Sequence, residues 1–228
     1  MYFHQTTTEL GDMVDEIQLE IPEVPVEAIN LHCRRAIIEF CELSHFWREE
    51  VGPIRVVKGA DGEMVEEYDL PVPQSRYVAS VMKVTTIKNN RLITLQRAEN
   101  RENLVILHRH DQDEVFYRYW QDTPFTIRFA PADRLEGQDM SIEAALVPNE
   151  LNKTIEFSAE ILRNYRDALT AGAKARLYKI PRKPWSDVGQ YQVNREFFER
   201  EATASLRHQA RGFSRLPDKA PDKERKFY

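Results

Sequence analysis

Apolar residues recur at three- and four-residue steps between residues 26 and 51. This spacing places them on one face of an amphipathic helix. The face consists of Ile29, Cys33, Ala36, Ile37, Phe40, Cys41 and Trp47. Pro25 suits the first turn, where its missing N–H leaves no hydrogen bond unmade, and Gly52-Pro53 is expected to end the helix.

The middle of the chain changes to the pattern of β structure, with β-branched residues and period-two alternation. The predicted strands are Tyr77–Ile87, Leu92–Leu95, Val115–Trp120, Phe125–Phe129 and Met140–Val147. Asn89-Asn90 offers a turn between the first two strands, and Pro148 ends the last. Five or so short strands separated by turn signals predict a small antiparallel sheet or sandwich.

Two further helices are expected, at residues 151–180 and 187–212. The apolar residues of the first cover so wide an arc that more than one neighbouring element must bury it. Between the two helices lies a corner that we term the elbow, in which small residues allow close packing, prolines fix the chain direction, and an aspartate restarts the helix. The elbow consists of Gly172, Ala173, Pro181, Pro184, Trp185 and Asp187.

These elements predict an α+β fold, with a bundle of long helices, an inserted small antiparallel β subdomain and an extended C-terminal tail. Pro22 and Pro25 favour an extended N-terminal segment. The expected organisation is an acidic N-terminal arm at 1–23, a helical bundle at 24–58 and 148–212, an inserted β-rich subdomain at 59–147 and a flexible basic tail at 213–228.

Charge is distributed unevenly along the 228 residues, whose net charge is −5. Residues 207–228 carry seven Lys or Arg and three Asp or Glu, a balance of +4, which leaves −9 for the rest of the chain. An acidic body argues against a general nucleic-acid binder. The first 23 residues hold six acids and no Lys or Arg, unlike the basic start of a secretory leader, and no apolar stretch is long enough for a membrane span.

The chain has two cysteines, Cys33 and Cys41. On one helix they would lie about 12 Å apart, whereas a disulfide needs Cα atoms within roughly 7 Å. We therefore expect two reduced core residues in a reducing compartment.

Reactive motifs are scarce: the sequence has no Gly-rich phosphate loop, no nucleophile elbow and no paired C-x-x-C. The segment from His108 to Glu114 is the one constellation of interest. His108 and His110 could bind a divalent metal, and Asp111, Asp113 or Glu114 could serve as a carboxylate pair for glycoside hydrolysis. No further ligand follows at a fixed spacing, so we interpret the segment as a polar loop and predict no catalytic residue, metal site or cofactor.

Two other features allow interaction with a partner. The aromatic residues between 116 and 129 could stack bases, but their surroundings are not basic and alternation places half of them in the core. The basic tail could contact nucleic acid or remain solvated; we favour docking on a protein partner, because aromatic residues anchor interfaces well. The docking residues would be Arg211, Phe213, Arg215, Leu216, Phe227 and Tyr228.

The elbow region resembles the signature of the head-to-tail adaptor proteins of short-tailed bacteriophages. The resemblance rests on Gly172–Tyr178 followed by Pro181–Asp187 and extends over roughly Ala28 to Phe198. Other matching pieces are Ala36–Cys41 with Trp47, Tyr68–Pro71, Thr123-Pro124-Phe125 with Ala130-Pro131, and Pro148 before the second long helix.

This resemblance implies a structural virion protein at the head–tail junction, assembled in the host cytoplasm. Such adaptors form a ring, commonly of twelve copies, which sits below the portal, receives a tail nozzle or hub protein and lets DNA pass as cargo. The C-terminal segment is implied to bind the portal. The acidic body agrees with a conduit that should not hold phosphates tightly.

Two alternatives remain open at this stage. A tail-associated peptidoglycan hydrolase would need two carboxylates facing a cleft, for which Asp111, Asp113 and Glu114 are the candidates. A nucleic-acid-binding module would use the basic tail and shift duplex DNA in a salt-dependent manner.

Overall fold

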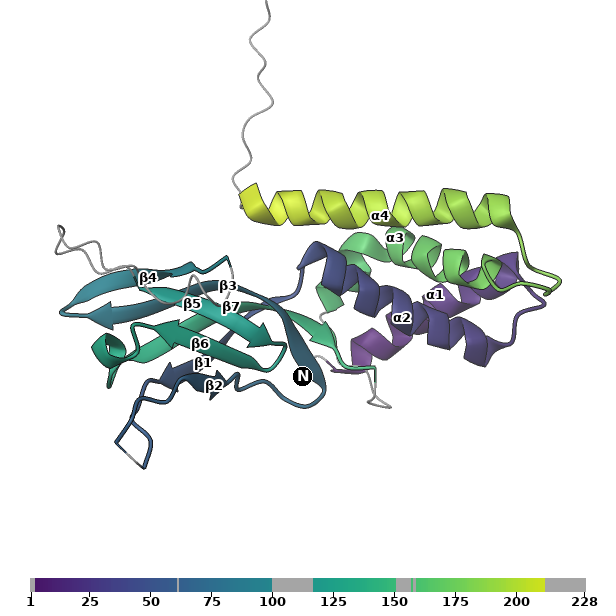
Figure 1. Cartoon of the computed structure of the whole chain (residues 1–228). Coiled ribbons are helices and arrows are strands. Elements are labelled where there is room, and N and C mark those ends of the chain that lie inside the picture. The colour runs from purple at the N-terminus through teal and green to yellow at the C-terminus, as the bar shows by residue number, and fades with distance from the viewer. Residues whose placement is uncertain (1–2, 61, 100–116, 151–156, 158, 212–228) are drawn as a thin grey trace, which may run out of the picture.

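The computed structural model describes residues 3–60, 62–99, 117–150, 157 and 159–211. Its helices are α1 (Phe3–Glu20), α2 (Val26–Ser44), α3 (Ala159–Tyr178) and α4 (Val188–Arg211), with a 3₁₀ turn at Asp133–Leu135. Its strands are β1 (Arg48–Arg55), β2 (Glu67–Asp69), β3 (Arg76–Lys88), β4 (Arg91–Arg97), β5 (Arg118–Thr123), β6 (Thr126–Ala130) and β7 (Asp139–Pro148). The helices gather at one end of the molecule and the strands at the other (Figure 1).

The predicted fold class is wrong, because the sheet is neither small nor purely antiparallel. The described strands form one seven-stranded sheet in the order β1-β7-β3-β4-β5-β6-β2, curled into a half-barrel. The pair β4–β5 is parallel and the remaining pairs are antiparallel, which makes the sheet mixed. Strand β3 has 13 residues and β7 has 10. The sheet is therefore a major layer of the fold rather than an insertion into a bundle of long helices.

The C-terminal end of α2 explains part of this error. Helical spacing predicted a helix continuing to Gly52-Pro53, but α2 ends at Ser44, and His45 takes a left-handed conformation with φ 50°. The following residues form β1, which pairs with β7. Gly52-Pro53 lies within this strand, where the register shifts between Val51 and Ile54. The dipeptide marks a β-bulge instead of a helix end.

The N-terminal segment also differs from the expected extended arm. Residues 3–20 form α1, and the buried side chains Met13, Ile17 and Ile21 follow at four-residue steps. This stripe packs against α2 and α3. A short apolar stripe within an acidic segment is enough to form a helix when a neighbouring surface buries it.

Helix α4 and the last strands agree with the sequence, whereas the described helix α3 (Ala159–Tyr178) is shorter than the helix expected at 151–180. Helix α4 begins after Asp187 and extends to Arg211, while β6 and β7 lie where alternation placed strands. Fully buried side chains connect the helices to one another, among them Phe40 of α2 and Phe198 of α4. None of the described helices has the length and apolar character needed to cross a bilayer.

Candidate docking surface

Gly172 of α3 is a point of close approach to α4. A Cβ atom at this position would lie 2.5 Å from Cδ2 and 2.7 Å from Cε2 of Phe198. The Phe198 ring is fully buried and contacts the ring of Phe40 at a centroid distance of 6.0 Å. Only glycine therefore leaves room for this ring, which packs α4 against Gly172 of α3 and Phe40 of α2.

The rest of the elbow joins the two helices by a short, hydrogen-bonded corner. Asp187 caps α4, because its Oδ1 accepts a hydrogen bond of 2.9 Å from the backbone N–H of Gln190. The backbone N–H of Asp187 donates to the carbonyl of Tyr178 at 3.2 Å, which ties the start of α4 to the end of α3. Trp185 is half-buried and packs against the core.

The two prolines of the elbow lie on the surface. Pro181 and Pro184 are exposed, as are the cations Arg182 and Lys183 between them. The Lys183 ammonium lies 5.7 Å from the ring centroid of Trp185, within cation–π range. The elbow thus presents two exposed positive charges, of which that of Lys183 lies over the indole.

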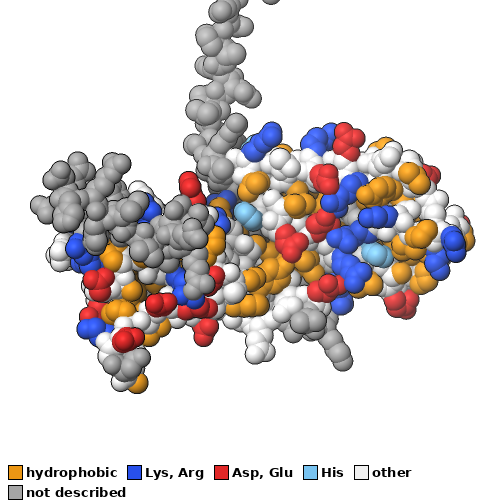
Figure 2. All heavy atoms as spheres, in the orientation of Figure 1, with side chains coloured by type: hydrophobic (Ala, Val, Ile, Leu, Met, Phe, Trp, Pro, Cys, Tyr) orange, Lys and Arg blue, Asp and Glu red, His pale blue; other side chains and the backbone are white. Residues whose placement is uncertain are grey.

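A groove of about 760 Å³ opens beside the elbow, between α2, α3 and α4. Figure 2 shows Lys and Arg side chains gathered over this region of the helices. Charged and apolar side chains alternate around it. The lining residues are His32, Glu39, Ala175, Arg176, Lys179, Ile180, Pro181, Tyr191, Arg195 and Glu199.

An ion-pair network forms the floor of the groove and joins its three helices. Glu39 of α2 accepts from Arg176 of α3 at 2.5 Å and from Arg195 of α4 at 2.6 Å, and Arg195 also donates to Glu199 at 2.6 Å. Each carboxylate is already neutralised by a guanidinium. Lys179, whose ammonium lies 5.7 Å from the Tyr191 ring centroid, adds a further positive charge at the rim.

His32 borders the same groove in its neutral form. Burial, followed by the nearby guanidinium groups of Arg35 and Arg176, lowers the pKa of His32 below its ordinary value. Its Nδ1 atom is buried without a hydrogen-bond partner among the described residues. Counting Arg176, Lys179 and Arg195 against Glu39 and Glu199 gives the lining a balance of +1 at neutral pH. The groove can therefore receive an acidic or amphipathic segment, and its lining holds no Ser, Thr or Cys nucleophile.

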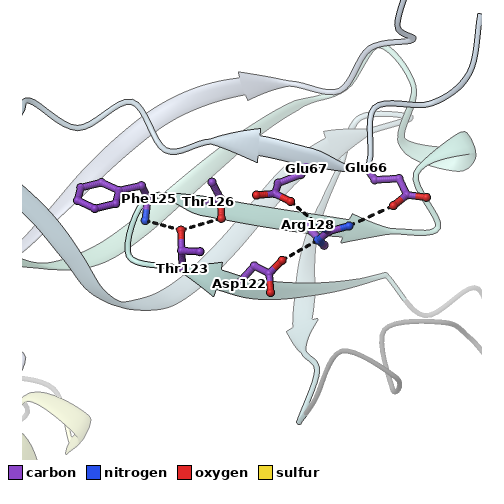
Figure 3. Close-up of polar contacts among 7 residues, drawn as sticks. All are labelled: Glu66, Glu67, Asp122, Thr123, Phe125, Thr126 and Arg128. Carbon is purple, nitrogen blue, oxygen red and sulfur yellow. Dashed lines mark hydrogen bonds and ion pairs between the residues drawn. The ribbon is translucent and has the colours of Figure 1, made fainter. Parts of the chain in front are cut away.

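A second charged cluster lies on the sheet, centred on Arg128 of β6 (Figure 3). The guanidinium donates to Asp122 at 3.0 Å, to Glu66 at 3.1 Å and to Glu67 at 2.5 Å. The three carboxylates come from β5 and from the start of β2, so one arginine clamps the edge strand to its neighbours. Within the described part of the chain, no group of three or more His, Cys, Asp or Glu is arranged to hold a metal ion.

Most residues of the predicted docking tail lie outside the described residues: Phe213, Arg215, Leu216, Phe227 and Tyr228. Arg211 is the last residue of α4. His108, His110, Asp111, Asp113 and Glu114 also lie outside the described residues, so the polar-loop interpretation stays a prediction.

Sequence reasoning missed the groove entirely. Its lining comes from α2 and from α3 and α4, which lie more than 100 residues further along the chain, and each helix contributes only a few positions. A signal was present in the i, i+3 pair Arg176 and Lys179 and the i, i+4 pair Arg195 and Glu199. Such pairs are common on solvated helix faces, and only the packing of the helices distinguishes a groove lining from an ordinary solvated face. No protein-family model matches this sequence, and no curated protein shows a significant match to it.

Proposed function

We propose that the chain is a head-to-tail adaptor of a tailed bacteriophage, a structural subunit that docks on the portal and forms a ring below it. The observation that carries the proposal is the elbow. It holds the 24-residue helix α4 firmly on α3, and α4 ends at Arg211, directly before the basic segment. A tail that follows a rigid helix is presented at a defined place for docking.

The packing of α4 suits a structural subunit whose role requires a fixed shape and no catalysis. Phe198 and Ala202 of α4 are buried, and the elbow is hydrogen-bonded, so α4 keeps its direction under load. The sequence of residues 213–228 is basic and low in apolar residues, a composition that suits a segment which folds against a groove on another subunit. In this function the portal, a tail nozzle or hub protein and further copies of the chain are the partners, and DNA passes through without specific contacts.

The test is co-assembly with portal rings from the same phage. The full chain and a variant lacking residues 213–228 are each mixed with purified portal and separated by sedimentation. We expect the full chain to co-sediment and the truncated chain to remain behind while showing an unchanged circular dichroism spectrum and melting temperature.

A matched control keeps the tail's length and composition but shuffles its order, which separates specific docking from simple charge attraction. Loss of binding in the shuffled variant supports a sequence-specific dock. Normal co-sedimentation of the truncated chain would refute portal docking through the tail, and failure of the full chain to bind would refute the adaptor function itself.

A further inference from the structure

Helix α1 carries an exposed acidic ridge with an apolar side chain in it. Asp12, Asp15 and Leu19 lie on one helix face at three- and four-residue steps, and Glu16 flanks them. All four side chains are exposed, and Leu19 is 86% exposed, the highest value among the large hydrophobic side chains of the described residues. A single exposed leucine is ordinary on a protein surface, so its use as an anchor depends on a groove of matching character.

The groove on the other side of the helices has the complementary character. Its apolar walls include Ala175, Ile180 and Tyr191, and its rim carries Lys179. The exposed Arg182 and Lys183 of the elbow follow directly after Pro181, which also lines the groove. An acidic helix with one apolar anchor therefore matches the groove in both charge and polarity.

The two surfaces face in different directions. Helix α1 packs on α2 and α3, while α4 packs on the same two helices from another side (Figure 1). The groove lies between α2, α3 and α4. A contact between the acidic ridge and the groove is consequently made between copies, and it is head-to-tail. Contacts of this kind either close into a ring or continue as a filament.

We propose that the groove of one copy receives the acidic ridge of α1 from the next copy, with Leu19 against its apolar wall and Asp12 and Asp15 facing its cations. The closure of this chain of contacts into a ring rests on the proposed adaptor function. The ridge-to-groove contact itself rests on the charges and exposures of the two surfaces.

Other occupants fit the groove less well. The chain's own basic segment has a balance of +4 and would meet the positive rim of Lys179, Arg182 and Lys183. A nucleic-acid backbone would be drawn to these cations, but its phosphates bring no apolar group to the wall formed by Ala175, Ile180 and Tyr191. The α1 ridge brings carboxylates to the cationic rim and a leucine side chain to the apolar wall, so it matches both parts of the groove.

Cross-linking between copies tests the contact. Leu19→Cys and Lys179→Cys are made in separate chains, mixed at about 0.2 mM and treated with a short bis-maleimide. The native thiols Cys33 and Cys41 are buried and their pKa values are raised by burial, that of Cys33 to about 12, so the folded wild-type chain should not react. We expect the mixed single variants to give a heterodimer band and the double variant, with both cysteines in one chain, to give a ladder of multimers.

A matched control pairs Lys179→Cys with Leu92→Cys, which is 68% exposed on the β3–β4 hairpin and lies outside both surfaces. This pair should give at least tenfold less heterodimer. Charge reversal by Asp12→Lys with Asp15→Lys should remove the ladder, and adding Arg182→Glu with Lys183→Glu in the partner chain should restore the heterodimer. About 0.5 M NaCl should weaken the band because it screens exposed charges.

Several outcomes overturn the inference: no ladder from the double variant, dimers of the Leu19→Cys chain with itself, a ladder insensitive to charge reversal, or protection of Lys179→Cys by duplex DNA. Portal co-sedimentation is scored on the same samples. If the portal still binds while the ladder is missing, the interface is wrong and the adaptor function stands. If the ladder forms and the portal does not bind, the interface stands and the function is wrong.

Discussion

Replacing Gly172 by alanine tests whether the contact between α3 and α4 is as tight as the structure indicates. The added Cβ would lie 2.5 Å from Cδ2 of Phe198, whereas ordinary carbon contacts begin near 3.4 Å, so ring or helix must move by about 0.9 Å. Phe198 is fully buried and rests against Phe40, which leaves the ring little room to turn.

The magnitude follows from two opposing effects. Overpacking a core by one methyl group costs about 1–3 kcal/mol, and alanine in a helix gains about 1 kcal/mol over glycine. The difference is about 0–2 kcal/mol, and because a buried ring is in the way we expect the upper half of that range, a net loss of about 1–2 kcal/mol in unfolding free energy. For a chain of this size the melting temperature should fall by about 2–8 °C.

Gly11→Ala in α1 is the matched control, because nothing lies within 4 Å of a Cβ built there. That variant keeps the propensity gain without the clash and should be more stable than the wild type by up to about 1 kcal/mol. Urea titrations followed by circular dichroism at 222 nm measure both variants.

A double-mutant cycle with Phe198→Leu isolates the clash. The smaller side chain should relieve it, so Gly172→Ala should cost at least about 1 kcal/mol less in that background. If Gly172→Ala stabilises the protein as Gly11→Ala does, or if the two changes at positions 172 and 198 are simply additive, the close packing of α3 and α4 is refuted.

Three further predictions concern the elbow, the sheet and the groove, each measured by urea titration. Trp185→Ala should lower the unfolding free energy by about 2–3 kcal/mol. This loss is smaller than for a fully buried indole because Trp185 is half-buried, and Trp185→Phe should retain most of the wild-type stability. Arg128→Met should cost about 1–2 kcal/mol, since it leaves three carboxylates facing one another, and about 0.5 M NaCl should recover part of the loss. The wild-type unfolding free energy should fall from pH 7.5 to 5.5. The pKa of His32 is lowered in the folded protein, so the unfolded chain binds more protons than the folded one as the pH falls through this range. His32→Gln should therefore reduce the dependence of the unfolding free energy on pH.

Each of these predictions has a clear contrary result. An unchanged unfolding free energy in Trp185→Ala would place the indole outside the core. Full stability of Arg128→Met at low salt would show that β2 is held by backbone pairing alone. An unaltered pH slope in His32→Gln would assign the acid sensitivity to another group, of which His45 is the first to test, since burial also lowers its pKa.

Local patterns predicted the elements whose chemistry is local. The proline pair and Asp187 marked the corner between α3 and α4, and period-two alternation marked β6 and β7. Gly172 could be assigned to a close helix contact from its small size and position, although its partner Phe198 could not be named from sequence.

Long-range arrangement could not be predicted in the same way. Helical spacing at Trp47 was accidental: this residue follows the helix, and its carbonyl accepts a hydrogen bond from Leu146 of β7. The parallel pairing of β4 with β5 joins residues about 22 positions apart and leaves no periodic trace. The groove depends on three helices meeting, so neither propensity nor motif spacing could reveal it.

The ends of the sheet region meet one another. Arg48 at the start of β1 is the register partner of Ala145 in β7, and the hydrogen bond from Leu146 N–H to the Trp47 carbonyl measures 2.7 Å. Because its two ends are this close, the sheet region could be excised and inserted into another protein through two short linkers. Neither linker would have to cross the width of either protein. A reporter domain or an affinity handle could take its place between the ends of α2 and β7 without forcing those ends apart.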